Sequence, residues 1–294
     1  MNKDFRSGFV TILGKPNAGK STLLNRLVGT KIAIATPRQN TTRNRIRGIV
    51  TTDDSQIVYM DTPGFIKVNN KLDERMHQSI VQSMDGVDVI LFLMPFWKNL
   101  DEDYLETIEI LKHKNAKKFL LLTKVDKADN KDEVFVKAQE LQERNLFDQI
   151  IPISSTRDIN IDKLVEEIKK NLTDEIPYYD AEQRHEFTEE FYAAEIIREK
   201  VLINLNDEVP HQVFVSTTKI DKKKNLTVIE AEIILNRESL KPIVIGKGGE
   251  KIKTIGQQAR KELERAYNGP VYLDLFVKVR KDWQNKESII KEFS

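Results

Sequence analysis

A glycine-rich stretch near the start of the chain constrains the fold more than any other feature. Residues 14–21 read GKPNAGKS, which fits the phosphate-binding template G-x-x-x-x-G-K-[ST]. The apolar run at residues 9–13 predicts a buried strand before the loop, and residues 21–28 after it have helical spacing. A strand that enters such a loop and a helix that leaves it are typical of an α/β domain that binds phosphate.

Each residue type in this loop suits an anion. Gly14 and Gly19 let the backbone bend without Cβ collisions, so that successive N–H groups and the helix N-terminus point at a phosphate. Lys20 adds a charge at the β- and γ-phosphates, and the Ser21 hydroxyl is placed to ligate Mg²⁺. The alternative is a strand-to-helix turn that binds nothing. The residues expected to contact the nucleotide here are Gly14, Lys15, Pro16, Asn17, Ala18, Gly19, Lys20, Ser21 and Thr22.

Length and composition bound the other possibilities. A chain of 294 residues suggests about two domains. It has no cysteine, which excludes disulfides and thiolate metal sites and is consistent with a reducing cytosol. Residues 1–6 lack the apolar core of a signal peptide, and no run approaches the ~18 apolar residues of a membrane span. We therefore expect a cytoplasmic protein, at most peripheral at the inner face of the cell membrane.

Strands and helices alternate along the first part of the chain. The pattern predicts strands at residues 9–13, 46–50, 56–60, 87–92, 118–122 and 149–153, and helices at 21–28, 72–84, 101–114, 131–145 and 161–172. Such alternation implies a mostly parallel sheet that is covered on both faces, with ligands at the carboxyl ends of the strands.

One further motif falls at the end of the third strand. Asp61, Thr62, Pro63 and Gly64 have the D-x-x-G spacing, in which the carboxylate reaches the Mg²⁺ shell and the glycine N–H meets the γ-phosphate. Taken alone, the tetrapeptide is equally typical of a plain turn.

A base-reading motif follows the fifth strand, where Thr123, Lys124 and Asp126 stand in the order T-K-V-D. A buried Asp126 carboxylate can accept both N1–H and N2–H₂ of guanine, whereas adenine would leave it unpaired, a difference that can discriminate by roughly 10⁴. After the sixth strand, Ser154 and Ser155 could offer backbone N–H groups to the guanine O6. Guanine is therefore the expected base.

Together these motifs resemble the GTPases of the translation-factor class over residues 8–172. That family usually has Asn where this chain has Thr123, and Ala where it has Ser155. Thr123 keeps one hydroxyl to tie the base loop to the phosphate loop, but it lacks the second contact of an amide, so we expect a lower nucleotide affinity. Ser155 would act through its backbone.

The resemblance also implies switch loops, at residues 31–42 and 61–72. Thr41 and Thr42 are both candidates for the switch threonine, and we expect Thr42, next to the arginine, to close over Mg²⁺ and the γ-phosphate. The expected metal ligands are then Ser21, Thr42 and Asp61, and the expected catalytic residues are Lys20, Thr42, Gly64 and Asn17.

Hydrolysis by the isolated protein is expected to be slow. Phe65 stands where many small GTPases carry a glutamine that orients the attacking water, and an apolar ring cannot do so. No arginine finger is evident, and such a finger is worth about 10³ to 10⁵ in rate. GTPases with similar phosphate loops use the residue equivalent to Asn17 to help hold a K⁺ ion beside the phosphates. Alternatively, Asn17 only satisfies a loop amide.

The second part of the chain begins after a polar, proline-broken stretch at residues 173–186, which predicts a linker. Beyond it we expect a helix at about 188–205, strands at 212–218 and 226–235 around a solvated hairpin tip at 221–225, an apolar strand-like run at 243–245, a helix to about residue 267 and a strand at 271–279. Residues 241–261 hold six basic residues and one acidic residue, although the net charge of the chain is only +1.

A G-x-x-G loop lies in this basic window, at a helix-to-helix junction. In isolation it would be a plain turn, but its flanks resemble a KH domain, in the bacterial form with an extra helix and strand at the front. KH domains bind single-stranded RNA, about four nucleotides in a groove beside this loop. The residues expected to bind RNA are Gly246, Lys247, Gly248, Gly249, Lys251 and Lys253.

A GTPase domain followed by this KH form resembles the Era family of ribosome-assembly GTPases over nearly the whole chain. Residues 39–43, 194–200, 252–256 and 277–283 also fit that family. The resemblance implies an α/β fold with a P-loop GTPase domain at residues 1–172, a linker, and an α+β type II KH domain at 187–294. It also implies GTP or GDP with Mg²⁺ as ligands, and the small ribosomal subunit, through the 3′ end of its RNA, as the partner. We expect a monomer.

A function of a different class is a metabolic nucleotide kinase whose second domain binds a small substrate. The guanine-reading Asp126 and the basic G-x-x-G loop argue against it.

Overall fold

The computed structural model describes residues 5–38, 41–65, 68–206 and 209–291, which form two compact units. The first unit comprises Met1–Ala33, Thr42–Ile66 and Met76–Glu186, and the second comprises Ile34–Thr41, Lys67–Arg75 and Phe187–Ser294. Residues 1–4, on which the signal-peptide argument partly depends, and Gln39 and Asn40 of the switch motif lie outside the described residues. No helix in the described ranges is long and apolar enough to cross a membrane.

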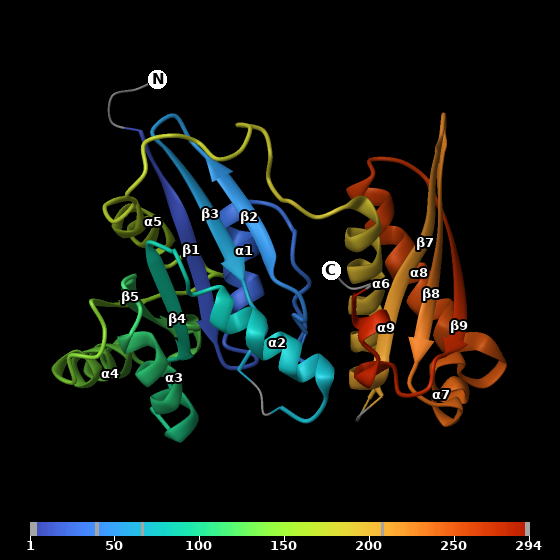
Figure 1. Ribbon diagram of the computed structural model, residues 1–294, viewed down its shortest axis with the longest axis horizontal. Helices are drawn as coiled ribbons and strands as arrows, with labels where there is room; N and C mark the ends of the chain where they lie inside the picture. Colours follow the sequence, from blue (N-terminus) through green and yellow to red (C-terminus); the bar gives the residue numbers. More distant parts are fainter. Residues whose placement is uncertain (1–4, 39–40, 66–67, 207–208, 292–294) are drawn as a thin grey trace. The chain divides into compact units, whose positions relative to one another are not determined.

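A six-stranded sheet forms the centre of the first unit, in the order β2-β3-β1-β4-β5-β6, and helices lie to either side of it (Figure 1). Only β2 is antiparallel to its neighbour, so the predicted mostly parallel sheet is confirmed. Its strands are β1 (Arg6–Gly14), β2 (Ile46–Thr51), β3 (Ser55–Asp61), β4 (Val89–Pro95), β5 (Lys117–Thr123) and β6 (Gln149–Pro152).

The helices of this unit occur where the apolar spacing predicts them: α1 (Lys20–Val28), α2 (Lys71–Gln82), α3 (Glu102–Lys112), α4 (Lys131–Glu143) and α5 (Ile161–Lys169). Alternate side chains of β4, such as Ile90 and Phe92, pack in one cluster with apolar residues of α2, α3 and α4. The helix α1 packs against β1, β2 and β3. Because a parallel sheet is buried on both faces, polar side chains with ligand chemistry are confined to the ends of its strands.

Residues 173–186, predicted as a linker, belong to the first unit. The backbones of Ser7 and Asp174 exchange two hydrogen bonds of 2.8 and 3.1 Å, and the Ile49 N–H donates to the Arg184 carbonyl at 2.9 Å. The buried Gln56 side chain donates to the Tyr179 carbonyl and accepts from its N–H. These bonds hold the segment against the strands despite its polar composition.

A three-stranded sheet with helices on one face forms the second unit. Strand β8 (Leu226–Leu235) lies between antiparallel β7 (Val213–Lys223) and parallel β9 (Val271–Val279). Alternate β8 residues Ile229, Ala231 and Ile233 are fully buried in a cluster with residues of α6 (Glu189–Asn204) and α8 (Glu250–Ala266). Figure 1 shows both helices on the same side of the sheet. The short helices α7 (Lys241–Ile245) and α9 (Glu287–Lys291) complete this part.

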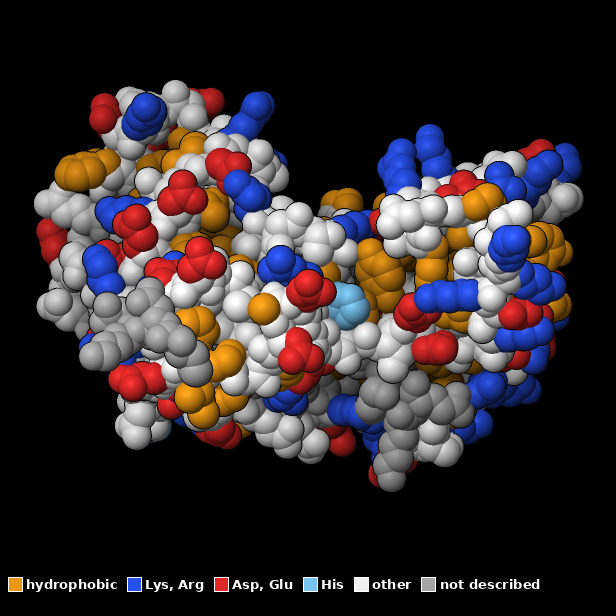
Figure 2. Space-filling view, turned by 90° about the horizontal axis from the view of Figure 1, so that it is seen from above, with side chains coloured by type: hydrophobic (Ala, Val, Ile, Leu, Met, Phe, Trp, Pro, Cys, Tyr) orange, Lys and Arg blue, Asp and Glu red, His pale blue; other side chains and the backbone are white. Residues whose placement is uncertain are grey.

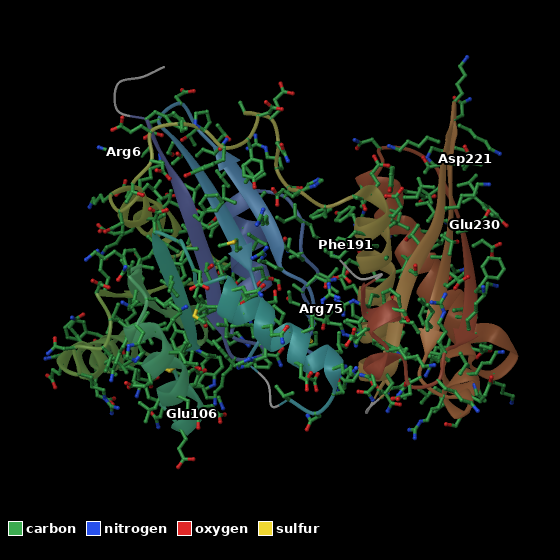
Figure 3. The ribbon with its side chains drawn as sticks, in the orientation of Figure 1. Arg6, Arg75, Glu106, Phe191, Asp221 and Glu230 are labelled. Carbon is green, nitrogen blue, oxygen red and sulfur yellow. The ribbon has the colours of Figure 1, made fainter. Side chains whose placement is uncertain are left out.

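Two predictions in this unit were wrong in detail. The apolar run at residues 243–245 is part of α7 and not a strand, because Pro242 suits a first helical turn and only Val244 of the three is buried. The expected hairpin tip at 221–225 is mostly strand: β7 continues to Lys223, with an irregularity between Thr217 and Lys219. Asp221 accordingly lies near the far end of the hairpin, and Glu230 lies along β8 (Figure 3).

Candidate functional site

The phosphate loop connects β1 to α1, and its lysine lies inside the protein. Lys20 is only 7% exposed. Its Nζ donates to the carbonyls of Gly14 at 3.0 Å and Lys15 at 3.2 Å. Burial lowers the pKa of Lys20 to about 8, although nearby Asp61 favours the charged form. A phosphate in the loop would supply the negative charge that this desolvated ammonium lacks.

Three oxygen-bearing side chains meet beside the loop, from α1, the segment before β2, and the end of β3. The Ser21 hydroxyl donates to Asp61 Oδ2 at 2.8 Å and lies 2.9 Å from the Thr42 hydroxyl. Thr42 in turn donates to the same Asp61 oxygen at 3.3 Å. The predicted metal ligands are therefore brought together.

The chemistry of this cluster fits a hard cation. Asp61 is fully buried, its Oδ1 has no hydrogen-bond partner among the residues that the structure describes, and burial raises its pKa. A buried acceptor without a donor is unfavourable unless a ligand satisfies it. Carboxylate and hydroxyl oxygens are ligands that Mg²⁺ accepts, and Mg²⁺ needs only a few from the protein.

The structure distinguishes the two candidate switch threonines. The Thr42 hydroxyl lies in the cluster just described, whereas the Thr41 hydroxyl donates to the Arg38 carbonyl at 2.7 Å and lies 2.7 Å from the Thr36 hydroxyl. In this conformation Thr42 is the one that could reach a metal at Ser21 and Asp61.

The segment after Asp61 packs closely against the phosphate loop. The Thr62 hydroxyl donates to the Ile12 carbonyl at 2.9 Å. A Cβ on Gly64 would lie 2.8 Å from the backbone nitrogen of Pro16, so that no larger residue fits without displacing the loop. Phe65 packs against the apolar cluster under β4 and α3. Its ring is therefore held by the core.

The base loop is tied to the phosphate loop at two points. The Thr123 hydroxyl donates to the Ala18 carbonyl at 2.8 Å, which is the tie that its position predicts. Lys124 Nζ donates to the Asn17 carbonyl at 2.7 Å. Asn17 and Lys124 both have positive φ, 63° and 62°, which is uncommon outside glycine. The two loops thus form one connected wall.

Asp126 lies at the end of this wall and is exposed, whereas the base-reading argument takes its carboxylate as buried. It stands in a one-turn helix, Val125–Lys127, which leaves its carboxylate at the surface. Fully buried Ser154 donates to Asp126 Oδ1 at 2.6 Å and orients it. This role of the Ser154 hydroxyl was not predicted, since the sequence pointed only to the backbones of Ser154 and Ser155.

The G-x-x-G loop of the second unit joins α7 to α8. Gly249 is the N-cap of α8 with φ 81°, and a Cβ there would meet no atom of the described residues within 4 Å. The backbone conformation favours glycine, while the space in front of it is open to a ligand. Lys247 and Lys253 are exposed, and Lys251 is half-buried.

A groove of about 320 Å³ runs beside this loop, between α8 and β9. Lys253 lines it, as do six residues that were not predicted: Ile252, Gly256, Gln257, Arg260, Leu273 and Leu275. Two signals could have identified them: the spacing of Lys253, Gln257 and Arg260 on one helix face, and the alternation of Leu273 and Leu275 on a strand. Lysine and arginine side chains are frequent on the visible face of the second unit (Figure 2).

Comparison with known proteins gives consistent results for both units. The family model described as "50S ribosome-binding GTPase" matches residues 9–124, and the one described as "KH domain" matches residues 208–284. The structure of an Aquifex aeolicus Era variant bound to GDP·AlF4⁻ is 36% identical to this chain, with a TM-score of 0.95 over 99% of each chain. A structure of Era with MgGDPNP and nucleotides 1506–1542 of 16S ribosomal RNA has the same identity, coverage and TM-score.

Proposed function

Because the chain belongs to the Era family of GTPases, we propose that it is a GTP-hydrolysing switch that binds the 3′ end of small-subunit ribosomal RNA and acts in assembly and maturation of the small ribosomal subunit. The observation that carries this proposal is the presence of two preformed sites in one chain. One is the buried cluster of Lys20, Ser21, Thr42 and Asp61, and the other is the open groove beside the G-x-x-G loop. A small-substrate kinase would not require that groove.

In the first site, Ser21, Thr42 and Asp61 would hold Mg²⁺, which neutralises charge on the β- and γ-phosphates when bound. Lys20 binds those phosphates from inside the loop. The Gly64 N–H would donate to the γ-phosphate, and Asp126, held by Ser154, would accept the guanine donors. The protein's part in hydrolysis is therefore to position the nucleotide and to stabilise charge.

Phe65 offers no group that could orient the attacking water, so we propose a slow intrinsic rate and a K⁺ ion near Asn17 as a partial substitute for an arginine finger. Hydrolysis should then be faster in K⁺ than in Na⁺, and Asn17→Ala should remove the difference, because a cation near the phosphates stabilises developing charge. Turnover of GTP at matched ionic strength measures this. Equal wild-type rates in the two salts would leave Asn17 with a structural role only.

In the second site, RNA would lie in the groove lined by Ile252, Arg260 and Leu275, with its backbone over the loop at Gly249. A single-stranded oligonucleotide of the small-subunit RNA 3′ end should bind. Gly249→Asp should weaken this binding by about tenfold or more, because its negative side chain fills the open face and repels the RNA phosphates. Fluorescence anisotropy gives both affinities.

Gly248→Ala is a second variant of the same loop, which adds a methyl group without a charge. GTP turnover shows whether the first unit is intact in each variant. If Gly249→Asp bound the oligonucleotide normally, the RNA part of the proposal would be wrong. Failure of the wild-type protein to hydrolyse GTP would instead contradict the GTPase part.

Nucleotide state should also alter RNA affinity. The segments Ile34–Thr41 and Lys67–Arg75, which overlap the expected switch loops, belong to the second compact unit. Coupling of about 5- to 150-fold is typical of such switches. The same titration, with protein loaded with GDP or a non-hydrolysable GTP analogue, measures it, and equal affinities would exclude coupling.

We further propose a cytoplasmic monomer with at most peripheral membrane contact, which sedimentation with and without vesicles tests.

A further inference from the structure

Trp97 lies in the turn between β4 and α3 and is 46% exposed. Nothing in the sequence motifs assigns it a role. The Phe96 N–H donates to the carbonyl of Thr123 at 3.1 Å, and the Lys98 N–H closes the turn on Pro95 at 2.9 Å. This turn is therefore attached directly to the first residue of the base loop.

The indole ring of Trp97 packs against an aromatic neighbour. Its edge-to-face contact with buried Phe96 has ring centroids 5.1 Å apart and an interplanar angle of 89°. On the far side of the turn, Lys137 donates to the Asn99 side chain at 2.7 Å. These contacts restrict the turn that carries the ring.

The group beside it is the ammonium of Lys124, which lies 5.7 Å from the centroid of the Trp97 ring. The same ammonium donates to the Asn17 carbonyl at 2.7 Å. Burial, together with nearby Lys127, lowers the pKa of Lys124, so its charged form needs compensating partners. The face of an indole is the best aromatic partner for a cation.

We infer that Trp97 is a positioning residue for nucleotide binding: its ring holds the Lys124 side chain against Asn17 and so keeps the base loop and the phosphate loop at a fixed spacing. This inference rests on the proposed function, since the two loops are those assigned to guanine and phosphate. Because GDP and GTP would both be bound by these two loops, losing the ring should weaken GDP and GTP binding equally.

The experiment measures GDP affinity by isothermal titration calorimetry for the wild type, Trp97→Ala and Trp97→Phe. We expect Trp97→Ala to bind GDP about two- to fivefold more weakly, the range of a partly exposed cation–π contact, and Trp97→Phe to restore most of the affinity. Phe135→Ala is the matched control, because Phe135 is a 68% exposed aromatic of the same unit on α4 with no place in either loop. The thermal unfolding midpoint of each variant without nucleotide excludes a general loss of structure.

Intrinsic fluorescence adds a readout that a purely structural role would not change. The chain has two tryptophans, and Trp283 is fully buried in the second unit. GDP should alter the tryptophan emission of the wild type and leave that of Trp97→Phe unaltered.

Equal GDP affinities of wild type and Trp97→Ala would overturn the inference. A wild-type tryptophan emission that does not change when GDP is added would also overturn it. If the wild-type protein bound no guanine nucleotide at all, the proposed function itself would be wrong, which is a separate result.

Discussion

The charged groups of the phosphate site lie inside the first unit, whereas those of the RNA groove lie on the surface of the second. Lys20 and Asp61 are buried, each already bonded to backbone or side-chain neighbours. Lys247, Lys253 and Arg260 are exposed. The charges of the first site are already in position, but burying them costs desolvation free energy. The charges of the second site remain hydrated.

This difference corresponds to the ligands. A triphosphate with its metal is small and must be fixed to a fraction of an ångström for hydrolysis, so preorganised charges in a site of low dielectric are effective. An RNA strand is long and flexible, and it can be bound by several weak contacts that also depend on salt. Substitutions in the two sites should therefore differ in size and in their dependence on ionic strength.

The largest effect is expected from Lys20→Ala. Removing a buried, preorganised charge that binds the phosphates should lower the GTP hydrolysis rate by about 10²-fold or more. Turnover under saturating Mg²⁺ measures it. Lys112→Ala on α3, where the side chain is 52% exposed and pairs with Glu109, is the control and should keep the wild-type rate. Normal turnover by Lys20→Ala would contradict the assignment of the phosphate site.

Asp126→Asn tests an exposed residue of the first site. An amide cannot accept both guanine donors, so GTP affinity should fall by about 10- to 100-fold and discrimination against xanthosine nucleotide should relax. Competition binding with the two nucleotides measures both. Ser154→Ala should show a weaker form of the same change, because it removes the 2.6 Å bond that orients Asp126. Unchanged affinity for GTP in Asp126→Asn would show that this carboxylate does not read the base.

The smallest effect is expected from Lys253→Ala in the groove. Loss of one exposed phosphate contact should weaken RNA binding a few-fold and reduce the slope of log K against log salt by about 0.7. Oligonucleotide titrations at several salt concentrations give the slope. Lys278→Ala on β9, outside the residues that line the groove, is the control. A slope unchanged in Lys253→Ala would place the RNA backbone elsewhere.

Much of the fold could be predicted from the pattern of residues. All six strands of the first sheet and the helices between them lie within a few residues of the expected ranges, because parallel strands and amphipathic helices have distinct apolar periods. Strands β8 and β9 have the predicted bounds. The error at residues 243–245 arose because a short apolar run has too few residues to show whether its period is two or nearly four.

The site divides in a similar way. The motifs themselves predicted Lys20, Ser21 and Asp61 as site residues, since the spacing of a phosphate loop and of a D-x-x-G turn is local in the chain. The choice between Thr41 and Thr42 needed the structure, because it depends on which hydroxyl lies near a residue 19 positions further along. The roles of Ser154 and Trp97 were also invisible in the sequence, as both act on side chains that other strands bring close.

What the sequence determined by itself is therefore the order of elements, the chemistry of the two loops and the family. These depend on local spacing and on residue type, which remain readable without coordinates. The tertiary structure decided which threonine hydroxyl lies beside Ser21 and Asp61, and which face of α8 lines the groove. It also decided that Asp126 is exposed and which neighbours contact Lys124. Each of these depends on how residues far apart in the chain are placed, which is fixed only when a sheet brings the ends of its strands side by side.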